Sequence, residues 1–586
     1  MAAKFCRILS NRRVVSKNAQ RNSTLDLKQY TRLYCKVISA FYSSICPSDE
    51  TIFTRARKHA ERTAIVDDKG SFTYGSILAI SQALGQKITE RYDSECNAES
   101  LKGKRVAFLC PNDVRYVAVQ WSIWRQAGIA VPLCEAHPVS MLEYFLRDSE
   151  STLLVSTEQF RSKVKHLVDV LNIAHIEVPN VENICTEMSE LSPTLTPMEA
   201  TTKCWDEVGA MIFYTSGTTG RPKGVLATHG NIRAQISGMV QAWEWTKDDC
   251  ILHVLPLHHV HGVINVLCCS LWVGATCVML PGFDPEKVWE YLTGSKLSLF
   301  MAVPTIYSKL IQYFQENNNY TRKQKEDIIK KCSQLRLMVS GSSALPEPTM
   351  KQWEIITGHT LLERYGMTEI GMALSNPLHG PRIPGSVGKP LPSVQVRIVA
   401  KGENNEECDD QVLVEGDEYG SKVFCQQDNV QGALQVKGPS VFKRYWGRPE
   451  ATQESFTSDG WFRTGDDAEY KDGVYKIMGR ASVDIIKSGG YKISALDIER
   501  ELLTHPNIRD IAVLGVPDDV WGQRVAALVS LNPGKSLNLE DIRKWSEERL
   551  SRYQTPSLLK IVADIPRNTM GKVNKKQLVE LFLNKE

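Results

Sequence analysis

The stretch Tyr214-Thr-Ser-Gly-Thr-Thr-Gly-Arg-Pro-Lys-Gly-Val225 indicates both the fold and the chemistry of this 586-residue chain. It follows an apolar run, residues 211–213, that is typical of the end of a buried strand. Glycines let backbone N–H groups approach an anion, hydroxyls add donors, and Lys223 supplies a compact positive charge. The loop is not a Walker A motif, because Pro222 separates the lysine from the preceding glycine. Such a loop alone is more often an ordinary surface turn, but its ordered hydroxyls and Pro-Lys-Gly ending predict a polyphosphate site.

The composition is that of a soluble globular protein with two or more domains, since 42% of the residues are hydrophobic and 23% are charged. The net charge of +3 and the lack of a basic stripe with interleaved aromatic residues argue against nucleic acid as a partner. The fifteen cysteines are scattered without any CxxC pair. We therefore expect reduced, mostly buried thiols in a reducing compartment rather than a disulfide framework.

The first 46 residues differ in character from the rest of the chain. They are rich in arginine and serine, and Asp26 is their single acidic residue. This composition is typical of a mitochondrial transit peptide and predicts a protein of the mitochondrial matrix; a disordered basic tail is the alternative. The basic residues are Lys4, Arg7, Arg12, Arg13, Lys17, Arg21, Lys28, Arg32 and Lys36.

Residues 254–283 form an uncharged stretch long enough to resemble a membrane span. Gly274 and Pro281 interrupt it, and a histidine cluster stands near its start. A buried helix over 263–272 followed by a buried strand over 275–280 explains the stretch better. We expect no membrane span.

Strand and helix patterns alternate from about residue 47 to residue 480. Strands are expected at 105–110, 129–133, 299–303 and 335–340, with a helix at 114–127. Such alternation predicts a large N-terminal α/β domain, residues 47–480, of parallel sheets flanked by helices. Residues 394–437 are strand-rich and add a subdomain. Within them we expect the acidic, polar segment 401–417 to be a solvated insertion.

The pattern of expected strands and helices changes after residue 480. Strands are expected at 511–516 and 525–531, and helices at 495–503 and 538–550. These elements predict a small α+β C-terminal domain, residues 481–586, with a hinge near residue 480.

Three further segments carry groups that suit a nucleotide. Glu363-Arg-Tyr-Gly-Met-Thr-Glu369 offers the ring of Tyr365 for stacking on a base and the carboxylate of Glu369 for Mg²⁺. Asp466 follows a tight turn and can accept hydrogen bonds from a ribose diol, with the donors of Arg480 nearby in sequence. Lys572 stands in a glycine-containing turn near the C-terminus.

Together the segments 214–225, 363–369, 464–466, 479–490 and 566–572 resemble the core motifs of the adenylate-forming superfamily. This superfamily comprises acyl-CoA synthetases, luciferases and peptide-synthetase adenylation domains, and the resemblance covers residues 50 to 580. It implies an active site between a large domain and a small mobile one. It also implies an enzyme that joins a carboxylic acid to coenzyme A. The acid attacks the α-phosphate of MgATP to give an acyl-adenylate and pyrophosphate, and the thiol of coenzyme A then displaces AMP.

The resemblance also assigns roles to individual residues. The phosphate loop corresponds to Thr215, Ser216, Gly217, Thr218, Thr219, Gly220, Arg221, Pro222 and Lys223. Gly341 and Ser342 match an adenine-side loop, Tyr365 the adenine-stacking position, Thr368 and Glu369 the α-phosphate and Mg²⁺ contacts, and Asp466 and Arg480 the ribose contacts. Lys572 matches the lysine that bridges the attacking carboxylate and the α-phosphate.

The hinge departs from the simplest pattern of the superfamily. The segment Gly479-Arg-Ala-Ser-Val-Asp484 is one residue longer than in many relatives, so that Ser482 and Asp484 both remain candidates for the pivot. After rotation of the small domain, the turn Ser488-Gly-Gly-Tyr491 would line the channel for the thiol.

The identity of the acid depends on fewer residues. The loop His258-His-Val-His-Gly262 matches the segment that gates the acyl pocket. Adjacent histidines point apart and no thiol or acidic ligand accompanies them, which favours imidazoles beside an acyl group over a zinc site. This loop, together with 363–369, 382–388 and 566–572, resembles the malonyl-CoA synthetases, and the leader fits their mitochondrial members.

That resemblance implies malonate or methylmalonate as the acid. A second carboxylate needs a cation in the pocket. Arg382 is the predicted partner, with His259 and His261 as helpers; alternatively Arg382 only orders its own loop. Other functions considered are a medium-chain fatty acyl-CoA synthetase, an enzyme that loads a carrier protein, and a catalytically silent binding protein.

Overall fold

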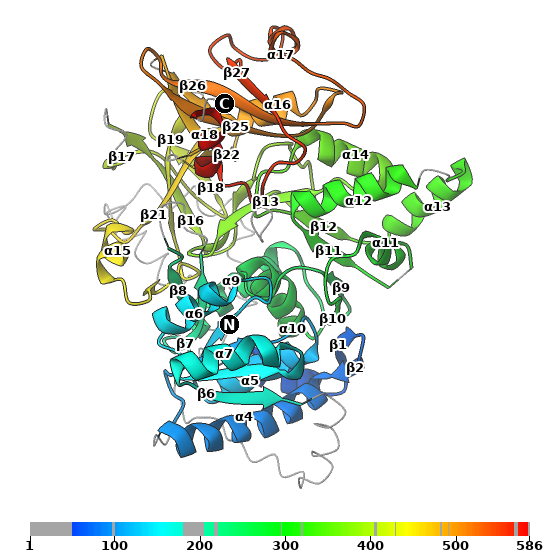
Figure 1. Cartoon of the computed structure of the whole chain (residues 1–586), viewed down its shortest axis with the longest axis vertical. Coiled ribbons are helices and arrows are strands. Elements are labelled where there is room, and N and C mark those ends of the chain that lie inside the picture. The colour runs from blue at the N-terminus through cyan, green and yellow to red at the C-terminus, as the bar shows by residue number, and fades with distance from the viewer. Residues whose placement is uncertain are drawn as a thin grey trace, which may run out of the picture. The chain divides into compact units, whose positions relative to one another are not determined.

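The protein is described by a computed structural model, which covers residues 50–96, 100–179, 204–215, 221–294, 296–317, 320–402, 407–427, 429–480, 483–489, 491–567 and 572–583. The predicted leader, residues 216–220 of the phosphate loop and Ser482 lie outside the described residues. Four sheets organise the described chain (Figure 1).

The first sheet has seven strands in the order β20-β8-β7-β4-β3-β5-β6. Strands β7, β4, β3, β5 and β6 are parallel, as the alternating pattern predicted, whereas β8 and β20 add antiparallel pairs at one edge. The strands are β3 (Arg105–Leu109), β4 (Ile129–Pro132), β5 (Leu153–Thr157), β6 (Ala174–Val178), β7 (Gly209–Tyr214), β8 (Gly224–Thr228) and β20 (Arg444–Tyr445). The helices of this part are α4 (Tyr74–Cys96), α5 (Val114–Arg125), α6 (Val139–Asp148) and α7 (Arg161–Leu171), and the 3₁₀ turn η2 (Glu158–Phe160) precedes α7.

The second sheet has nine strands in the order β15-β14-β13-β12-β11-β9-β10-β1-β2. Its central strands are parallel, and antiparallel hairpins close both edges. The strands are β1 (Thr63–Asp67), β2 (Gly70–Thr73), β9 (Cys250–His253), β10 (Thr276–Met279), β11 (Leu299–Ala302), β12 (Leu337–Ser340), β13 (Leu362–Met367), β14 (Gly371–Ser375) and β15 (Lys389–Pro390).

Helices cover the second sheet because its central strands are apolar on both faces. Every residue of β11 and β12 is buried. The side chains of Trp289, Tyr307 and Trp353 join these strands to three of the helices in one core. The helices are α9 (His229–Ala242), α10 (Cys269–Val273), α11 (Pro285–Gly294), α12 (Pro304–Glu316), α13 (Arg322–Cys332) and α14 (Glu347–Thr357), with α3 (Ile52–Ala56) and the turn η1 (Arg57–His59) at the start.

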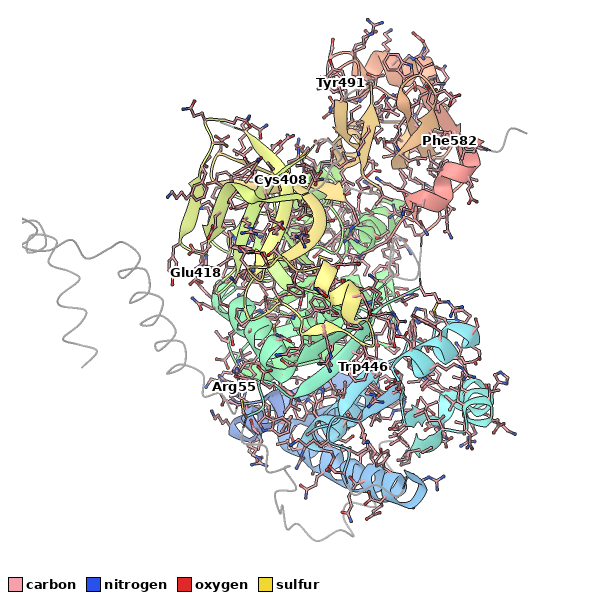
Figure 2. All side chains as sticks on the ribbon, turned by 90° about the vertical axis from the view of Figure 1, so that its left-hand side faces the viewer. Arg55, Cys408, Glu418, Trp446, Tyr491 and Phe582 are labelled. Carbon is pink, nitrogen blue, oxygen red and sulfur yellow. The ribbon has the colours of Figure 1, made fainter. Side chains whose placement is uncertain are left out.

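The third sheet is antiparallel and has the order β18-β17-β16-β19-β21-β22. It corrects the prediction of a solvated insertion at 401–417, because β17 pairs with β16 along its length. In Figure 2, Cys408 marks this strand and Glu418 the turn that follows it. The strand tolerates acidic residues because Arg463 of the same sheet pairs with the carboxylates of Glu407 and Asp409. The elements are β16 (Gln395–Lys401), β17 (Glu407–Asp417), β18 (Gly420–Val423), β19 (Val430–Lys437), α15 (Pro449–Glu454), β21 (Phe462–Lys471) and β22 (Val474–Arg480).

The C-terminal part is the α+β unit that the sequence predicted. Strands β25 and β26 form a long antiparallel pair, β23 and β24 extend it, and β27 joins β26 in parallel. Ile498, Leu502 and Ile542 carry helices α16 and α17 onto one face of this sheet. The elements are β23 (Ile485–Ser488), β24 (Tyr491–Ser494), α16 (Ala495–Leu502), β25 (Ile508–Asp518), β26 (Gly522–Leu531), α17 (Leu539–Ser546), β27 (Leu558–Ile561) and α18 (Lys575–Leu583).

The uncharged stretch 254–283 folds into the interior of the second sheet region. It contains the π-helix His261–Cys268, then α10 and β10, and all eight residues of the π-helix are buried. A methyl group at Gly262 would lie 2.4 Å from the carbonyl oxygen of Pro256, so only glycine allows this close approach. Within the described part of the chain, no helix is both long and apolar enough to cross a membrane.

Candidate active site

The two ends of the predicted phosphate loop are held together by backbone pairing. Strands β7 and β8 are antiparallel neighbours, and Thr215 N–H donates to the carbonyl oxygen of Lys223 over 3.0 Å. The loop is therefore the tip of a hairpin rather than a strand-to-helix turn. Lys223 Nζ lies 4.9 Å from the ring centre of Tyr445, and Arg221 lies over the ring of Tyr144. Both cations thus stand at the mouth of the loop.

Tyr365, Asp466 and Arg480 form one hydrogen-bonded group on the nucleotide side. Asp466 and Arg480 are direct cross-strand partners on β21 and β22, and Arg480 Nε donates to Asp466 Oδ1 over 3.1 Å. Tyr365, in β13, donates a hydrogen bond from its hydroxyl to Asp466 Oδ2 over 2.6 Å. The structure thus brings together three residues that are 115 positions apart at most. Asp466 raises the pKa of Arg480, which keeps the guanidinium charged.

Glu369 occupies the turn between β13 and β14, next to Thr368. Its side chain is buried, and Tyr445 donates a hydrogen bond to Oε1 over 2.9 Å. Burial raises the pKa of this carboxyl, although Tyr445, Arg480 and Lys572 oppose the shift. A buried carboxylate with a raised pKa gains from a nearby cation. The oxygen chemistry of Glu369 therefore fits Mg²⁺.

Lys572 reaches the same group of charges from the C-terminal part. Burial lowers the pKa of its ammonium group, Arg480 lowers it further, and the carboxylates of Asp466 and Glu369 oppose this. The charge of Lys572 also depresses the pKa of His259 in the histidine loop. Lys572 thus stands where the nucleotide side meets the histidine loop.

The histidine loop presents neutral imidazoles. Burial lowers the pKa of His259 and of His261 well below 6.5, and the neighbouring Arg364 adds to the effect at His261. His261 Nδ1 lies 3.1 Å from the hydroxyl of Ser342. The buried Nε2 atoms of His259 and His261 have no hydrogen-bond partner within the described chain. Both histidines therefore keep a ring nitrogen available for a ligand.

Arg364 is the functional candidate that the sequence analysis missed. Only 3% of this residue is exposed, yet Nε and Nη2 have no hydrogen-bond partner among the described residues. A methyl group at Gly341 would lie 2.5 Å from its guanidinium carbon, so the fork packs directly against the backbone of the predicted adenine-side loop. Burial lowers its pKa to about 9, which still leaves the group charged at neutral pH. An uncompensated buried arginine calls for an anion.

Arg382, the residue predicted for this role, is bonded elsewhere. Its guanidinium donates to the carbonyl oxygen of Thr360 and, over 3.1 Å, to that of Leu378. It lines a surface hollow together with Met350 and Glu354. These bonds favour the alternative that Arg382 orders its own loop, and the arginine that lies beside His261 is Arg364. The signal available in the sequence was the arginine inside the 363–369 motif itself.

The hinge region contains a buried ion cluster around Asp484. Lys575 Nζ, from α18, lies 2.6 Å from Asp484 and 2.8 Å from Glu499, and Asp484 also accepts the backbone N–H of Arg480 over 3.0 Å. Asp484 therefore links the last strand of the large domain to the C-terminal helix. Ser482, the other candidate pivot, is outside the described residues.

Comparisons with known proteins agree with this geometry. A family model described as AMP-binding enzyme matches residues 52–446, and one described as AMP-binding enzyme C-terminal domain matches residues 497–572. The chain is 51% identical over 536 residues to the Xenopus laevis protein named malonate–CoA ligase ACSF3, mitochondrial. This match covers 91% of the present chain and 92% of the Xenopus protein. It is 38% identical over 572 residues to the malonate–CoA ligase of Arabidopsis thaliana, with 91% and 88% covered.

Solved structures of related enzymes have a similar fold. The crystal structure of ATP-bound MatB from Rhodopseudomonas palustris superposes with a TM-score of 0.77 at 29% identity, covering 91% of this chain and 98% of that one. A malonyl-CoA ligase in a ternary product complex with methylmalonyl-CoA and AMP matches with a TM-score of 0.59 at 28% identity, covering 87% and 97%.

Proposed function

Because the chain belongs to the AMP-binding enzyme family, we propose that it ligates malonate, with methylmalonate as a second substrate, to coenzyme A at the expense of ATP. The observation that supports this choice of acid most strongly is the buried guanidinium of Arg364 beside the histidine loop, because two of its nitrogens have no partner among the described residues. The names of the relatives support the same substrate. The proposed location is the mitochondrial matrix, with residues 1–46 as the transit peptide.

The first half-reaction takes place around Lys572. An oxygen of the malonate carboxylate attacks the α-phosphorus of ATP, the bond from that phosphorus to the bridging oxygen breaks, and pyrophosphate leaves. Lys223 and the loop 215–223 hold the departing phosphates, while Lys572 stabilises the carboxylate and the α-phosphate as negative charge accumulates. Asp466 and Arg480 hold the ribose and so fix the line of attack.

Glu369, with Thr368 beside it, would hold the Mg²⁺ that accompanies ATP. When bound, this ion neutralises phosphate charge. The hydrogen bond from Tyr445 fixes one oxygen of Glu369 and leaves the carboxylate oriented by the protein before the substrate arrives.

The second half-reaction joins the acyl group to the thiol. The sulfur of coenzyme A attacks the carbonyl carbon of the adenylate, and the bond from that carbon to the AMP oxygen breaks. We propose residues 47–480 and 481–586 as two domains, with Asp484 as the pivot, because Asp484 links Arg480 to Lys575. Rotation about this pivot withdraws Lys572 and brings the turn that begins at Ser488 to the thiol.

Arg364 explains how a diacid is selected. The carboxylate that does not react forms a charge-assisted pair with the two unpaired nitrogens of Arg364, and neutral His261 can donate a hydrogen bond. A monocarboxylic acid leaves this buried cation unpaired, which disfavours its binding.

A panel of acids tests the proposal. The purified chain is assayed for coenzyme A-dependent AMP release with malonate, methylmalonate, butyrate and octanoate. We expect malonate to give the highest kcat/KM and methylmalonate to follow. A preference for octanoate or butyrate would contradict the proposal and favour a fatty acyl-CoA synthetase.

The variants Arg364→Met and Arg382→Met form a matched pair for the same assay. Loss of the partner of a buried carboxylate costs about 3–5 kcal/mol, so we expect Arg364→Met to lower kcat/KM for malonate about 10²–10³-fold. Arg382→Met should retain the preference for malonate, because its bonds go to its own loop. Equal losses of kcat/KM for malonate in the two variants would contradict the proposed role of Arg364.

A further inference from the structure

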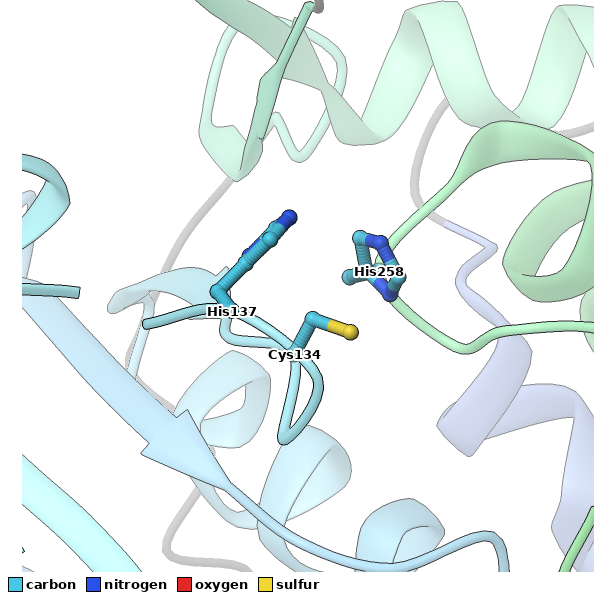
Figure 3. A group of neighbouring side chains, drawn as sticks. All are labelled: Cys134, His137 and His258. Carbon is cyan, nitrogen blue, oxygen red and sulfur yellow. The ribbon is translucent and has the colours of Figure 1, made fainter. Parts of the chain in front are cut away.

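A second group of potential metal ligands includes the first residue of the histidine loop (Figure 3). Cys134 and His137 come from the connection between β4 and α6, and His258 comes from the loop after β9. One ligand atom from each of the three lies within 4.8 Å of the other two. His258 lies more than 120 positions from Cys134 and His137 in sequence, so the fold alone brings it to them. The expectation that no thiol accompanies the histidines is therefore wrong.

The distances are close to those that a tetrahedral ion needs. With zinc–sulfur bonds of about 2.3 Å and zinc–nitrogen bonds of about 2.0–2.1 Å, neighbouring ligand atoms lie about 3.4–3.6 Å apart. The remaining gap is at most about 1.4 Å, which rotations of the three side chains can close. The rings of His137 and His258 already face each other edge to face, with centres 5.3 Å apart.

Independent features point to a ligand at this position. His258 is 7% exposed, and its Nε2 has no hydrogen-bond partner within the described chain; the same holds for Nδ1 of His137. Such buried, unpaired nitrogens are costly unless they bind something. The backbone N–H of His137 donates to the carbonyl oxygen of Cys134 over 3.1 Å, which fixes the turn that carries both side chains.

The chemistry of the three ligands selects the class of ion. One thiolate and two imidazoles suit borderline and soft ions, whereas Mg²⁺ and Ca²⁺ require oxygen ligands. Cys134 and His137 are half-buried, which gives an ion a path from solvent. Three protein ligands leave a fourth position for water, as in open zinc sites.

We propose that Cys134, His137 and His258 form a binding site for a zinc-class divalent cation, distinct from the Mg²⁺ position at Glu369. The site adjoins the acyl side of the active site, because the rings of His258 and His259 have centres 3.8 Å apart. A bound ion fixes His258 and with it the orientation of the histidine loop. Binding also releases the proton of the Cys134 thiol, since the metal takes the thiolate.

Cobalt(II) and zinc(II) serve as probes on the full chain after treatment with a chelator. We expect one Co²⁺ per chain with a thiolate-to-cobalt charge-transfer band in the near ultraviolet and the strong visible bands of a tetrahedral site. Zinc should displace the cobalt and abolish both signals. Calorimetry in two buffers of different ionisation enthalpy should show release of about one proton per zinc bound.

Cys134→Ser and His258→Asn should each lose the charge-transfer band or the tetrahedral bands, and should weaken zinc binding more than the roughly 10–100-fold that loss of an outer partner costs. Cys425→Ser, at a half-buried cysteine outside the cluster, is the matched control and should bind as the parent does. Thermal melts without metal establish that the variants fold. The site is refuted if the parent shows no thiolate band, or if Cys134→Ser and Cys425→Ser bind zinc equally. Because the readout is binding rather than activity, the result is independent of the proposed ligase reaction.

Discussion

The nucleotide side and the acyl side of the active site differ in how their buried polar groups are satisfied. On the nucleotide side, Tyr365, Asp466 and Arg480 bond to one another, and Glu369 accepts from Tyr445. On the acyl side, Arg364, His259 and His261 keep buried atoms that have no partner in the described chain.

The difference indicates how each substrate contributes to the stability of the site. A network that is already bonded holds its geometry before ATP binds and needs little reorganisation. Unpaired buried groups instead cost stability in the free enzyme, and a matching diacid recovers that cost on binding. The acyl side therefore acts as the selective half of the site, and the nucleotide side as the preorganised half.

Lys572 joins the two sides, so its removal should have the largest effect. We expect Lys572→Ala to slow adenylate formation about 10²–10³-fold, the usual loss when a group that stabilises transition-state charge is removed. Thioester formation from pre-made malonyl-adenylate should be spared. ATP–pyrophosphate exchange measures the first step and single-turnover thioester formation the second. Lys576→Ala, at an exposed neighbouring lysine, is the control, and an undiminished exchange rate in Lys572→Ala would contradict the role.

Glu363 is a further buried group with an unsatisfied atom, because its Oε2 has no partner among the described residues. Burial raises the pKa of its carboxyl from 4.5 to about 7. A raised carboxyl pKa favours the folded state at low pH, and this contribution is lost as pH rises from about 4.5 through about 7. In Glu363→Gln that loss should disappear. Relative to the parent, the free energy of unfolding of the variant should therefore rise by roughly 2–3 kcal/mol between pH 5 and pH 8.

Urea unfolding at the two pH values measures this change. Glu450→Gln, at an exposed position on α15, is the control and should show no such pH-dependent gain. A Glu363→Gln variant whose stability tracks the parent at both pH values would mean that Glu363 is ionised in the folded protein.

Asp466→Asn tests the hydrogen-bonded network of the nucleotide side. Arg480 loses its charged partner, and we expect the free energy of unfolding to fall by about 2 kcal/mol, within the range for hydrogen bonds to charged groups. The KM for ATP should rise while the KM for malonate stays the same, because Asp466 belongs to the nucleotide side. A parallel rise in both KM values would show that the two sides are not separable.

Arg364→Met should give the smallest change in the free energy of unfolding, and this change should have the opposite sign to that of Asp466→Asn. Removal of an unpaired buried cation is expected to raise the free energy of unfolding without substrate by about 1 kcal/mol. Malonate should stabilise the parent in thermal melts and have no such effect on the variant. A variant that is less stable than the parent would mean that Arg364 already has a partner in the free enzyme.

Much of the fold was predictable from local patterns. The strands around 105–110, 129–133 and 299–303 and the α+β C-terminal unit were identified correctly, because buried strands and amphipathic helices leave period-2, continuous or 3.6-residue apolar patterns. Residues 407–417 were misjudged, because two acidic side chains of β17, Glu407 and Asp409, pair with Arg463, which is distant in sequence. The π-helix at 261–268 has no sequence signature of its own.

The active site, like the fold, was predictable from the sequence only in part. The amino-acid sequence was enough to identify the kinds of groups present: hydroxyls and a lysine for phosphates, a tyrosine and two carboxylates for a nucleotide, and a lysine near the C-terminus for the reacting acid. Their order along the chain was enough to indicate the superfamily.

The fold was needed to distinguish Arg364 from Arg382, because a guanidinium is characterised by what surrounds it. Arg382 donates to nearby carbonyl oxygens, whereas Arg364 is buried against Gly341, and its Nε and Nη2 have no partner among the described residues. The tertiary structure likewise placed Cys134 and His137 against His258. Burial and hydrogen-bond partners depend on contacts between distant segments, and such contacts leave no local pattern in the sequence.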